Sequence, residues 1–283
     1  MAPPAKPRLT EHDLRGFKYF RVLGPLFAHL QTAGTERDGA GNRQLFYDQY
    51  ATLMLVYFFS PTLTSLRGLQ QATTLAKVQQ RLGVRRTSLG ALSEAAYVCD
   101  AALLHEVIGE LGAQLQPHVP VAEQDALRTL TAVDGSLLPA LPRMAWALWQ
   151  DAQHRAAKMH VAFAVLRHGP VDVTVTAGNA SERAELRRLV QPGGFYVFDR
   201  GYADYTLFQE LHALPCSFVG RVQNNAAYEV QEERPVSAAA EALGVCRDGT
   251  LRRLGTSHHV RLLPQPFRVV QVATGKTEPD AGL

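Results

Sequence analysis

Cysteine is scarce in this sequence of 283 residues. The three cysteines, Cys99, Cys216 and Cys246, lie far apart, and no C-x-x-C pair is present. A zinc site built on paired cysteines is therefore not expected. A small, odd number of cysteines is typical of proteins from the reducing cytoplasm, so we predict a cytoplasmic location.

Long hydrophobic runs are also lacking. The longest, LMLVYFFS from Leu53, is too short to cross a bilayer. The N-terminal segment MAPPAKPRLTEHDLRG has no apolar stretch of the kind found in signal peptides. We therefore predict that the protein has no membrane partner. Hydrophobic residues make up 46% of the chain, which is enough to build a sizeable core.

Lysine is rare, and the numbers of basic and acidic residues are nearly equal. Only five of the 29 basic residues are lysines, and the net charge is +3. Arginine suits the geometry of phosphate groups, although a GC-rich coding bias explains most of such an excess. The charge permits a nucleic-acid partner without requiring one.

Residues 1–118 are predicted to form a helical N-terminal domain that binds DNA. The segment HDLRGFKYFRVLGPLFAHL predicts a helix interrupted near Gly24 and Pro25. QLFYDQYATLMLVYFFS predicts a buried helix that stops before Pro61.

A pair of helices with a basic turn follows in this domain. SLRGLQQATTLAKVQQRLG predicts one amphipathic helix closed by Gly83, and the next helix begins with Thr87 or Ser88 as its N-cap. The pair resembles a helix-turn-helix in outline. Arg85 and Arg86, in the turn, are therefore candidate DNA-binding residues, although most basic turns are simply solvated.

Residues 119–283 change to a strand-rich pattern after a break at QPHVPVAEQD. The predicted order is a strand ending at Asp134, two strands around a turn, a helix, a strand, a helix and a strand. This order indicates an α/β fold with a mixed sheet and flanking helices. The two strands around the turn are predicted at 160–166 and 171–177, and Ser181 is placed to cap the helix after them. Beyond Asn224, short strands in AAYEVQEER, HHVRLLP and FRVVQVATG are expected.

Asp134 and Asp199 share one layout. Each is predicted to end a strand, and a glycine follows at once or one residue later, in VDGS and FDRGY. The carboxyl ends of strands are where α/β sheets build their sites. Two carboxylates there favour a Mg²⁺ or Mn²⁺ site, which suits phosphodiester displacement. The alternative is an ordinary turn, because Asp before Gly is a common turn dipeptide.

Residues 131–221 resemble the catalytic core of insertion-sequence DDE transposases of the IS-four-like group. The resemblance rests on TAVDGS, KMHVAFAVLRHGPVDVTVTAGNASE and FYVFDRGYADYTLFQEL in this order and spacing. It implies a ribonuclease H-like fold with a partial β-rich insertion. It also implies that Asp134 and Asp199 are the first two acids of the catalytic triad and hold Mg²⁺ (or Mn²⁺). The implied partner is double-stranded DNA, both transposon ends and target, in a bacterial, nucleoid-associated setting.

The third acid of this family stands on a later helix in a Y-x2-R-x3-E-x6-K pattern. None of the glutamates after Arg221 stands in such a pattern. We therefore expect a C-terminally truncated transposase that is inactive on its own. Such a chain is expected to expose apolar sheet surface and to pair with itself as a homodimer or with a full-length transposase.

Two further residues near the predicted site are candidate DNA contacts. Arg200 directly follows Asp199, and His160 lies in the predicted strand that comes after the strand with Asp134. A histidine in a strand is more often structural. Tyr202 is expected to pack rather than to stack on a base.

Three functions remain open at this point. The first is an active or truncated transposase, and the second is a non-catalytic DNA-binding remnant or inhibitor of transposition. The third is an unrelated hydrolase with paired carboxylates, such as a glycosidase. Metal-dependent DNA cleavage distinguishes the first from the second, and a glycosidase would need neither metal nor DNA.

Overall fold

The computed structural model describes residues 9–31, 38–39, 41–116, 127, 129–139, 147, 155–256 and 259–273. Contacts divide the chain into two compact units, Met1–Gln114 and Leu115–Leu283. The division falls close to the domain boundary predicted after residue 118, and DNA binding by the first unit stays a prediction. Among the described residues no helix is both long and apolar enough to cross a membrane.

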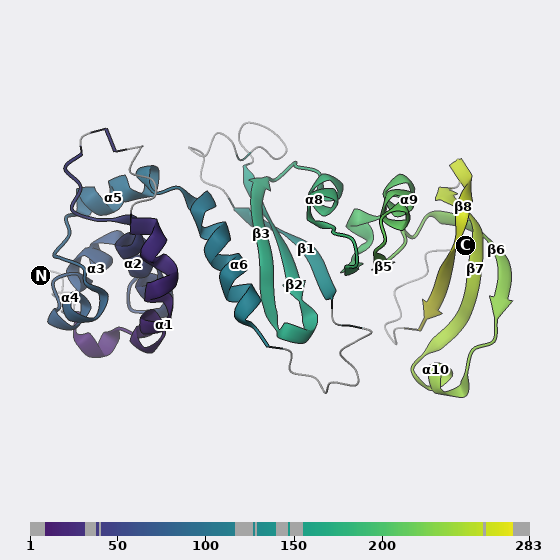
Figure 1. Cartoon of the computed structure of the whole chain (residues 1–283), viewed down its shortest axis with the longest axis horizontal. Coiled ribbons are helices and arrows are strands. Elements are labelled where there is room, and N and C mark those ends of the chain that lie inside the picture. Colours follow the sequence, from purple (N-terminus) through teal and green to yellow (C-terminus); the bar gives the residue numbers. More distant parts are fainter. Residues whose placement is uncertain are drawn as a thin grey trace, which may run out of the picture. The chain divides into compact units, whose positions relative to one another are not determined.

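The first unit is helical in its described part (Figure 1). Its core contains the helix predicted in the apolar run, α2, which ends before Pro61 as expected, with Leu53 and Val56 fully buried. Its elements are η1 (Glu11–Asp13), α1 (Phe17–Phe27), η2 (Ala28–Gln31), α2 (Tyr47–Phe59), α3 (Leu66–Ala72), α4 (Ala76–Leu82), α5 (Leu89–Val98), η4 (Ala101–Leu103) and α6 (Leu104–Gln114).

The predicted interruption near Gly24 and Pro25 is wrong. Helix α1 continues through Pro25 to Phe27. Proline has no N–H to donate to the helix. Directly after Phe27 the α-helix changes to the 3-10 helix η2, and the Ala28 N–H donates to the Pro25 carbonyl. The structure therefore tolerates the missing hydrogen bond near the end of the helix.

The single amphipathic helix predicted from Ser65 to Gly83 is in fact two, α3 and α4. The break comes at Thr73 and Thr74, whose hydroxyls donate to the carbonyls of Gln70 and Gln71, each at 2.7 Å. Such side-chain bonds to the backbone compete with a continuing helix. The predicted end at Gly83 is confirmed, since this residue is left-handed with φ +64°.

Helix α5 begins as predicted at Ser88, whose hydroxyl accepts a hydrogen bond from the Ala91 N–H at 3.0 Å. The turn before it presents Arg85 and Arg86, both exposed. Val84 beside them is buried, so the turn is anchored in the core while its cations face solvent.

The second unit is built on a five-stranded mixed sheet of order β3-β2-β1-β4-β5 (Figure 1). β1 pairs antiparallel with β2 and β2 with β3, whereas β1 pairs parallel with β4 and β4 with β5. This order, with these directions, is that of the ribonuclease H-like fold and confirms the predicted fold class. The strands are β1 (Leu130–Pro139), β2 (Ala156–Ala164), β3 (Gly169–Ala177), β4 (Phe195–Phe198) and β5 (Ser217–Gly220).

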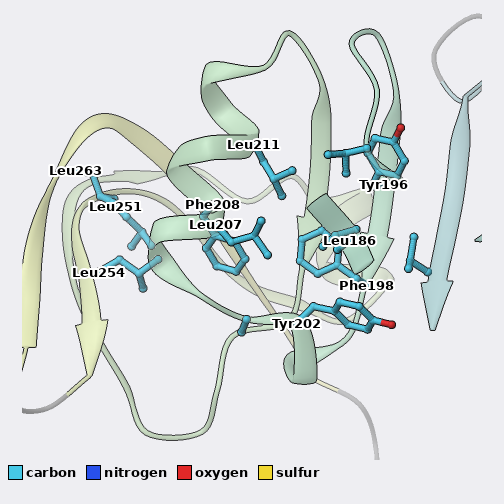
Figure 2. Close-up of a cluster of buried hydrophobic side chains, with 13 residues drawn as sticks. Leu186, Tyr196, Phe198, Tyr202, Leu207, Phe208, Leu211, Leu251, Leu254 and Leu263 are labelled. Atoms are coloured by element: carbon cyan, nitrogen blue, oxygen red, sulfur yellow. The ribbon is translucent and has the colours of Figure 1, made fainter. Parts of the chain in front are cut away.

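The helices between the strands pack their apolar side chains against those of this sheet. α8 (Glu182–Leu189) follows β3, the turn η6 (Arg200–Tyr202) follows β4, and α9 (Tyr205–Ala213) leads to β5; η5 (Val165–Arg167) joins β2 to β3. Figure 2 shows Leu186 of α8 and Leu207, Phe208 and Leu211 of α9 packed with Phe198 of β4. Burial of these large apolar side chains is the main source of stability here.

A second, three-stranded antiparallel sheet follows, of order β6-β7-β8. Its elements are β6 (Ala226–Arg234), α10 (Ala238–Ala242), β7 (Val245–Thr256) and β8 (His259–Val272). Leu251, Leu254 and Leu263 join the core cluster of α8 and α9 (Figure 2). The sequence prediction missed β7 and divided β8 in two at its prolines, Pro264 and Pro266, which an edge strand can accept.

Candidate active site where β1 and β4 stop pairing

The two predicted catalytic aspartates lie on neighbouring parallel strands. The pairing of β1 with β4 runs to Val133 opposite Phe198, so Asp134 and Asp199 are the next residue on each strand. Neighbouring strands lie about 4.8 Å apart, and the two carboxylates therefore share one edge of the site. Both residues are exposed.

Asp134 does not end its strand as predicted. β1 continues to Pro139 because its other neighbour, β2, continues to pair with it as far as Ala156. Only the pairing with β4 stops at Val133, and the chain after Asp199 turns away into η6. Asp134 therefore lies at the point where the parallel half of the sheet ends.

Backbone amides hold both carboxylates. Asp134 Oδ1 accepts a hydrogen bond from the Gly135 N–H at 2.8 Å, and Asp199 Oδ1 accepts one from the Gly201 N–H at 2.7 Å. Each aspartate is thus fixed by the glycine that follows it. Among the described residues, no hydrogen bond is found to the second oxygen of either carboxylate, which leaves it available to a ligand.

Helix α8 brings a third carboxylate to this edge. Ser181 caps the helix by accepting a hydrogen bond from the Ala184 N–H at 3.4 Å, as predicted, and Glu182 is the first helical residue. Lys158 of β2 forms an ion pair with Glu182, Nζ to Oε1 at 3.2 Å, and also lies 3.4 Å from the Ala180 carbonyl oxygen. Only 13% of the Lys158 side chain is exposed, so the pair is partly shielded from water.

Tyr202 lies beneath the site. The residue is only 1% exposed, its ring packs 6.0 Å from that of Phe198, and Figure 2 shows its hydroxyl directed out of the apolar cluster. That hydroxyl has no hydrogen-bond partner among the described residues. Burial raises the pKa of the Tyr202 phenol above its ordinary value, and the carboxylates of Glu182, Asp134 and Asp199 add to the effect.

His160 is part of the inner wall of the site. The residue is 4% exposed, and its Nε2 lies 2.9 Å from the Thr176 hydroxyl. Burial lowers the pKa of the imidazole, which favours the neutral ring. Because its side chain is buried, His160 is poorly suited to the DNA phosphate contact predicted for it. Its Nδ1 lies instead near the carboxylate of Glu182.

The predicted arginine contacts lie on the surface. Arg200 is exposed, directly after Asp199, and its guanidinium bonds to the Asn224 side chain at 3.3 Å. Arg85 and Arg86 are also exposed and belong to the first unit.

The donor set suits a hard divalent cation. Carboxylate oxygens are the ligands that Mg²⁺ and Mn²⁺ prefer, and Asp134 and Asp199 offer them side by side. The unpartnered Tyr202 hydroxyl and His160 Nδ1 add polar atoms behind them. Within the described ranges, no three His, Cys, Asp or Glu side chains are already arranged to hold a metal ion.

Asp134 and Asp199 are both exposed to solvent. One larger hollow of the described surface, of about 670 Å³, lies between α9, β5 and β8 and is lined by Phe208, Phe218 and Phe267 among others. It contains neither aspartate. An exposed pair of carboxylates suits a large substrate better than an enclosed small molecule.

A ribonuclease H-like sheet with two acids on adjacent parallel strands, where their pairing stops, is an arrangement typical of enzymes that cut phosphodiester bonds. Residues 125–273 match the family model described as the transposase DDE domain. This match spans more than half of the chain, and the chain belongs to that family.

Two known proteins are similar to parts of this chain. A Sinorhizobium fredii (strain NBRC 101917 / NGR234) protein whose name describes it as a transposase, y4zB, is 26% identical over 181 residues, covering 62% of this chain and 49% of that protein. A cryo-EM structure of the piggyBac transposase synaptic complex with hairpin DNA matches with a TM-score of 0.40 and 10% identity, covering 73% of this chain and 51% of that one. The chain spans about half the length of each.

Sequence reasoning missed Glu182 as a residue of the site. An acidic residue soon after TAGN belongs to the motifs that carry the family resemblance, but its place directly after an N-cap serine indicates only a helix start and gives no site role. Tyr202 was expected to pack, and its burial confirms this.

Proposed function

We propose that this chain is the core of a DDE transposase that cuts and joins DNA phosphodiester bonds with Mg²⁺ or Mn²⁺ at Asp134 and Asp199. The observation that carries the proposal is the register of β1 and β4, which puts the two aspartates next to each other. Family membership supports the same reaction. A divalent cation bound there would supply Lewis-acid activation of a water or 3′-hydroxyl and neutralise charge on the phosphate.

The chain's own residues position the ion and the DNA. Gly135 and Gly201 hold the two carboxylates through their N–H groups, which fixes the ligand oxygens before any ion binds. Arg200, exposed next to Asp199, is proposed to contact a DNA phosphate. Arg85 and Arg86 in the first unit are proposed to hold the transposon ends.

The test is nicking of supercoiled plasmid in Mg²⁺ or Mn²⁺ by the whole chain. We expect Asp134→Asn and Asp199→Asn each to reduce the nicking rate at least about 100-fold, because each removes a charged ligand. Asp172→Asn, which changes a carboxylate on β3 paired with Arg188, serves as the control and should leave the rate unchanged. Equal rates in the original chain and both variants would contradict the proposal.

A second function is favoured by one observation. None of the glutamates after Arg221 stands in the Y-x2-R-x3-E-x6-K pattern that carries the family's third acid, which is compatible with a chain that binds DNA without cutting it. A folded chain that binds transposon-end duplex but shows no nicking above the level of the variants would establish this function. Family membership leaves no support for a glycosidase.

A further inference from the structure

Glu182 lies between the two glycines that follow the candidate catalytic aspartates. Its Oε1 is 3.3 Å from the point where a Cβ on Gly135 would stand, and its Oε2 is 2.7 Å from the same point on Gly201. The point on Gly201 is also 3.1 Å from Oδ1 of Asp199, so these two carboxylates are close neighbours. Glycine at both positions leaves room for a third carboxylate beside the pair.

Two buried polar atoms face the same space. The Tyr202 hydroxyl and His160 Nδ1 lie 3.4 and 3.6 Å from the point where a Cβ on Gly135 would stand, beside Glu182 Oε1. Neither atom has a hydrogen-bond partner among the described residues, although the two side chains are more than nine-tenths buried. Buried polar groups are nearly always hydrogen-bonded, so both atoms point to a polar ligand at this place.

A cation already contacts the third carboxylate. The Lys158 ammonium lies 3.2 Å from Glu182 Oε1 and is mostly shielded from water. Three carboxylates brought together repel one another unless positive charge is placed among them. Lys158 supplies one such charge from β2, and a divalent ion would supply more.

We propose that Glu182 is the third carboxylate ligand of the divalent-cation site formed with Asp134 and Asp199, and that Lys158 competes with the ion for it. The inference rests on the proposed function, because it concerns the same site. Mg²⁺ keeps several of its waters when it binds to proteins. The Tyr202 hydroxyl and His160 Nδ1 are then positioned to hydrogen-bond those waters, which gives both atoms partners.

The test is a Mn²⁺ titration of the full chain, followed by the electron paramagnetic resonance signal of free Mn²⁺. Glu182→Gln is expected to weaken Mn²⁺ binding at least about tenfold, and Lys158→Met to strengthen it several-fold. Glu210→Gln is the matched control, since it also removes a carboxylate from an ion pair, that with Arg187. It should leave the affinity unchanged, and thermal melting should show all variants folded.

The outcomes separate this inference from the proposed function. If Asp134→Asn and Asp199→Asn abolish binding while Glu182→Gln matches the Glu210→Gln control, Glu182 is not a ligand and the inference is overturned. If neither aspartate variant changes Mn²⁺ binding, the proposed function fails as well. A Lys158→Met chain that binds Mn²⁺ more weakly would overturn the competition between lysine and ion.

Discussion

The Tyr202 hydroxyl is buried in the core cluster of the second unit with no hydrogen-bond partner among the described residues. Tyr196 is buried in the same cluster, but its hydroxyl has a partner: it accepts a hydrogen bond from the Gln191 N–H at 2.8 Å. The two tyrosines therefore form a natural comparison between a satisfied and an unsatisfied buried hydroxyl.

Tyr202→Phe is expected to leave the metal-free protein as stable as before or slightly more stable. Removing an unpartnered buried hydroxyl loses no hydrogen bond, whereas Tyr196→Phe should cost about 1 kcal/mol. Urea unfolding without added metal measures both. A loss of about 1 kcal/mol or more in Tyr202→Phe would show that its hydroxyl has a partner in the folded chain.

At the scale of single elements, the N-terminus of α8 sets the place of Glu182. Ser181→Ala removes the cap and should cost about 0.5–2 kcal/mol of stability. It should also weaken Mn²⁺ binding, because Glu182 is the next residue. Ser237→Ala, the cap of the short helix α10, is the control, and calorimetry with Mn²⁺ titration compares the two. Equal Mn²⁺ affinities in the two variants would show that the Ser181 cap does not affect the metal site.

The second sheet has its own electrostatic contact. Arg268 of β8 donates two hydrogen bonds to Asp248 of β7, at 2.9 and 2.6 Å, and they hold the pKa of that carboxyl below its ordinary value. A carboxyl with a lowered pKa stabilises the fold above its ordinary pKa of about 3.9, and this contribution is lost as the pH falls below that value.

Arg268→Met should therefore destabilise the second unit at pH 7, and its difference from the original chain should shrink as the pH drops below about 4. Chemical unfolding across this pH range measures the difference. Arg261→Met, on the same strand, controls for loss of an arginine. A difference that stays constant down to pH 3 would show that the stabilisation does not depend on the charge of Asp248.

Local patterns predicted much of the fold. N-caps at Ser88 and Ser181, the helix end at Gly83 and the order of strands and helices around Asp134 and Asp199 follow from neighbouring residues, and the structure confirms them. The continuation of β1 past Asp134 did not follow, because it depends on pairing with β2. The Glu182 carboxylate was missed for the same kind of reason, since its contacts with Gly135 and Gly201 join residues distant in sequence.

At the scale of the whole molecule, the chain is divided into two units with separate cores. Leu53 in the first unit and Leu207 in the second are matched buried leucines, 0% and 1% exposed. Leu→Ala at either position should cost about 2–5 kcal/mol. We expect two unfolding transitions, and each substitution should lower only the transition of its own unit, measured by calorimetry. A single transition lowered by both would show that the units unfold together.

A divalent cation is proposed to bind where the pairing of β1 with β4 stops, beside Asp134 and Asp199. The most direct measurement replaces Mg²⁺ with Fe²⁺ and adds hydrogen peroxide, which the bound Fe²⁺ reduces to hydroxyl radicals that cut the polypeptide nearby. We predict cuts close to Asp134 and Asp199 that disappear in Asp134→Asn and with excess Mg²⁺. Cuts confined to other segments, or unchanged in Asp134→Asn, would contradict the account.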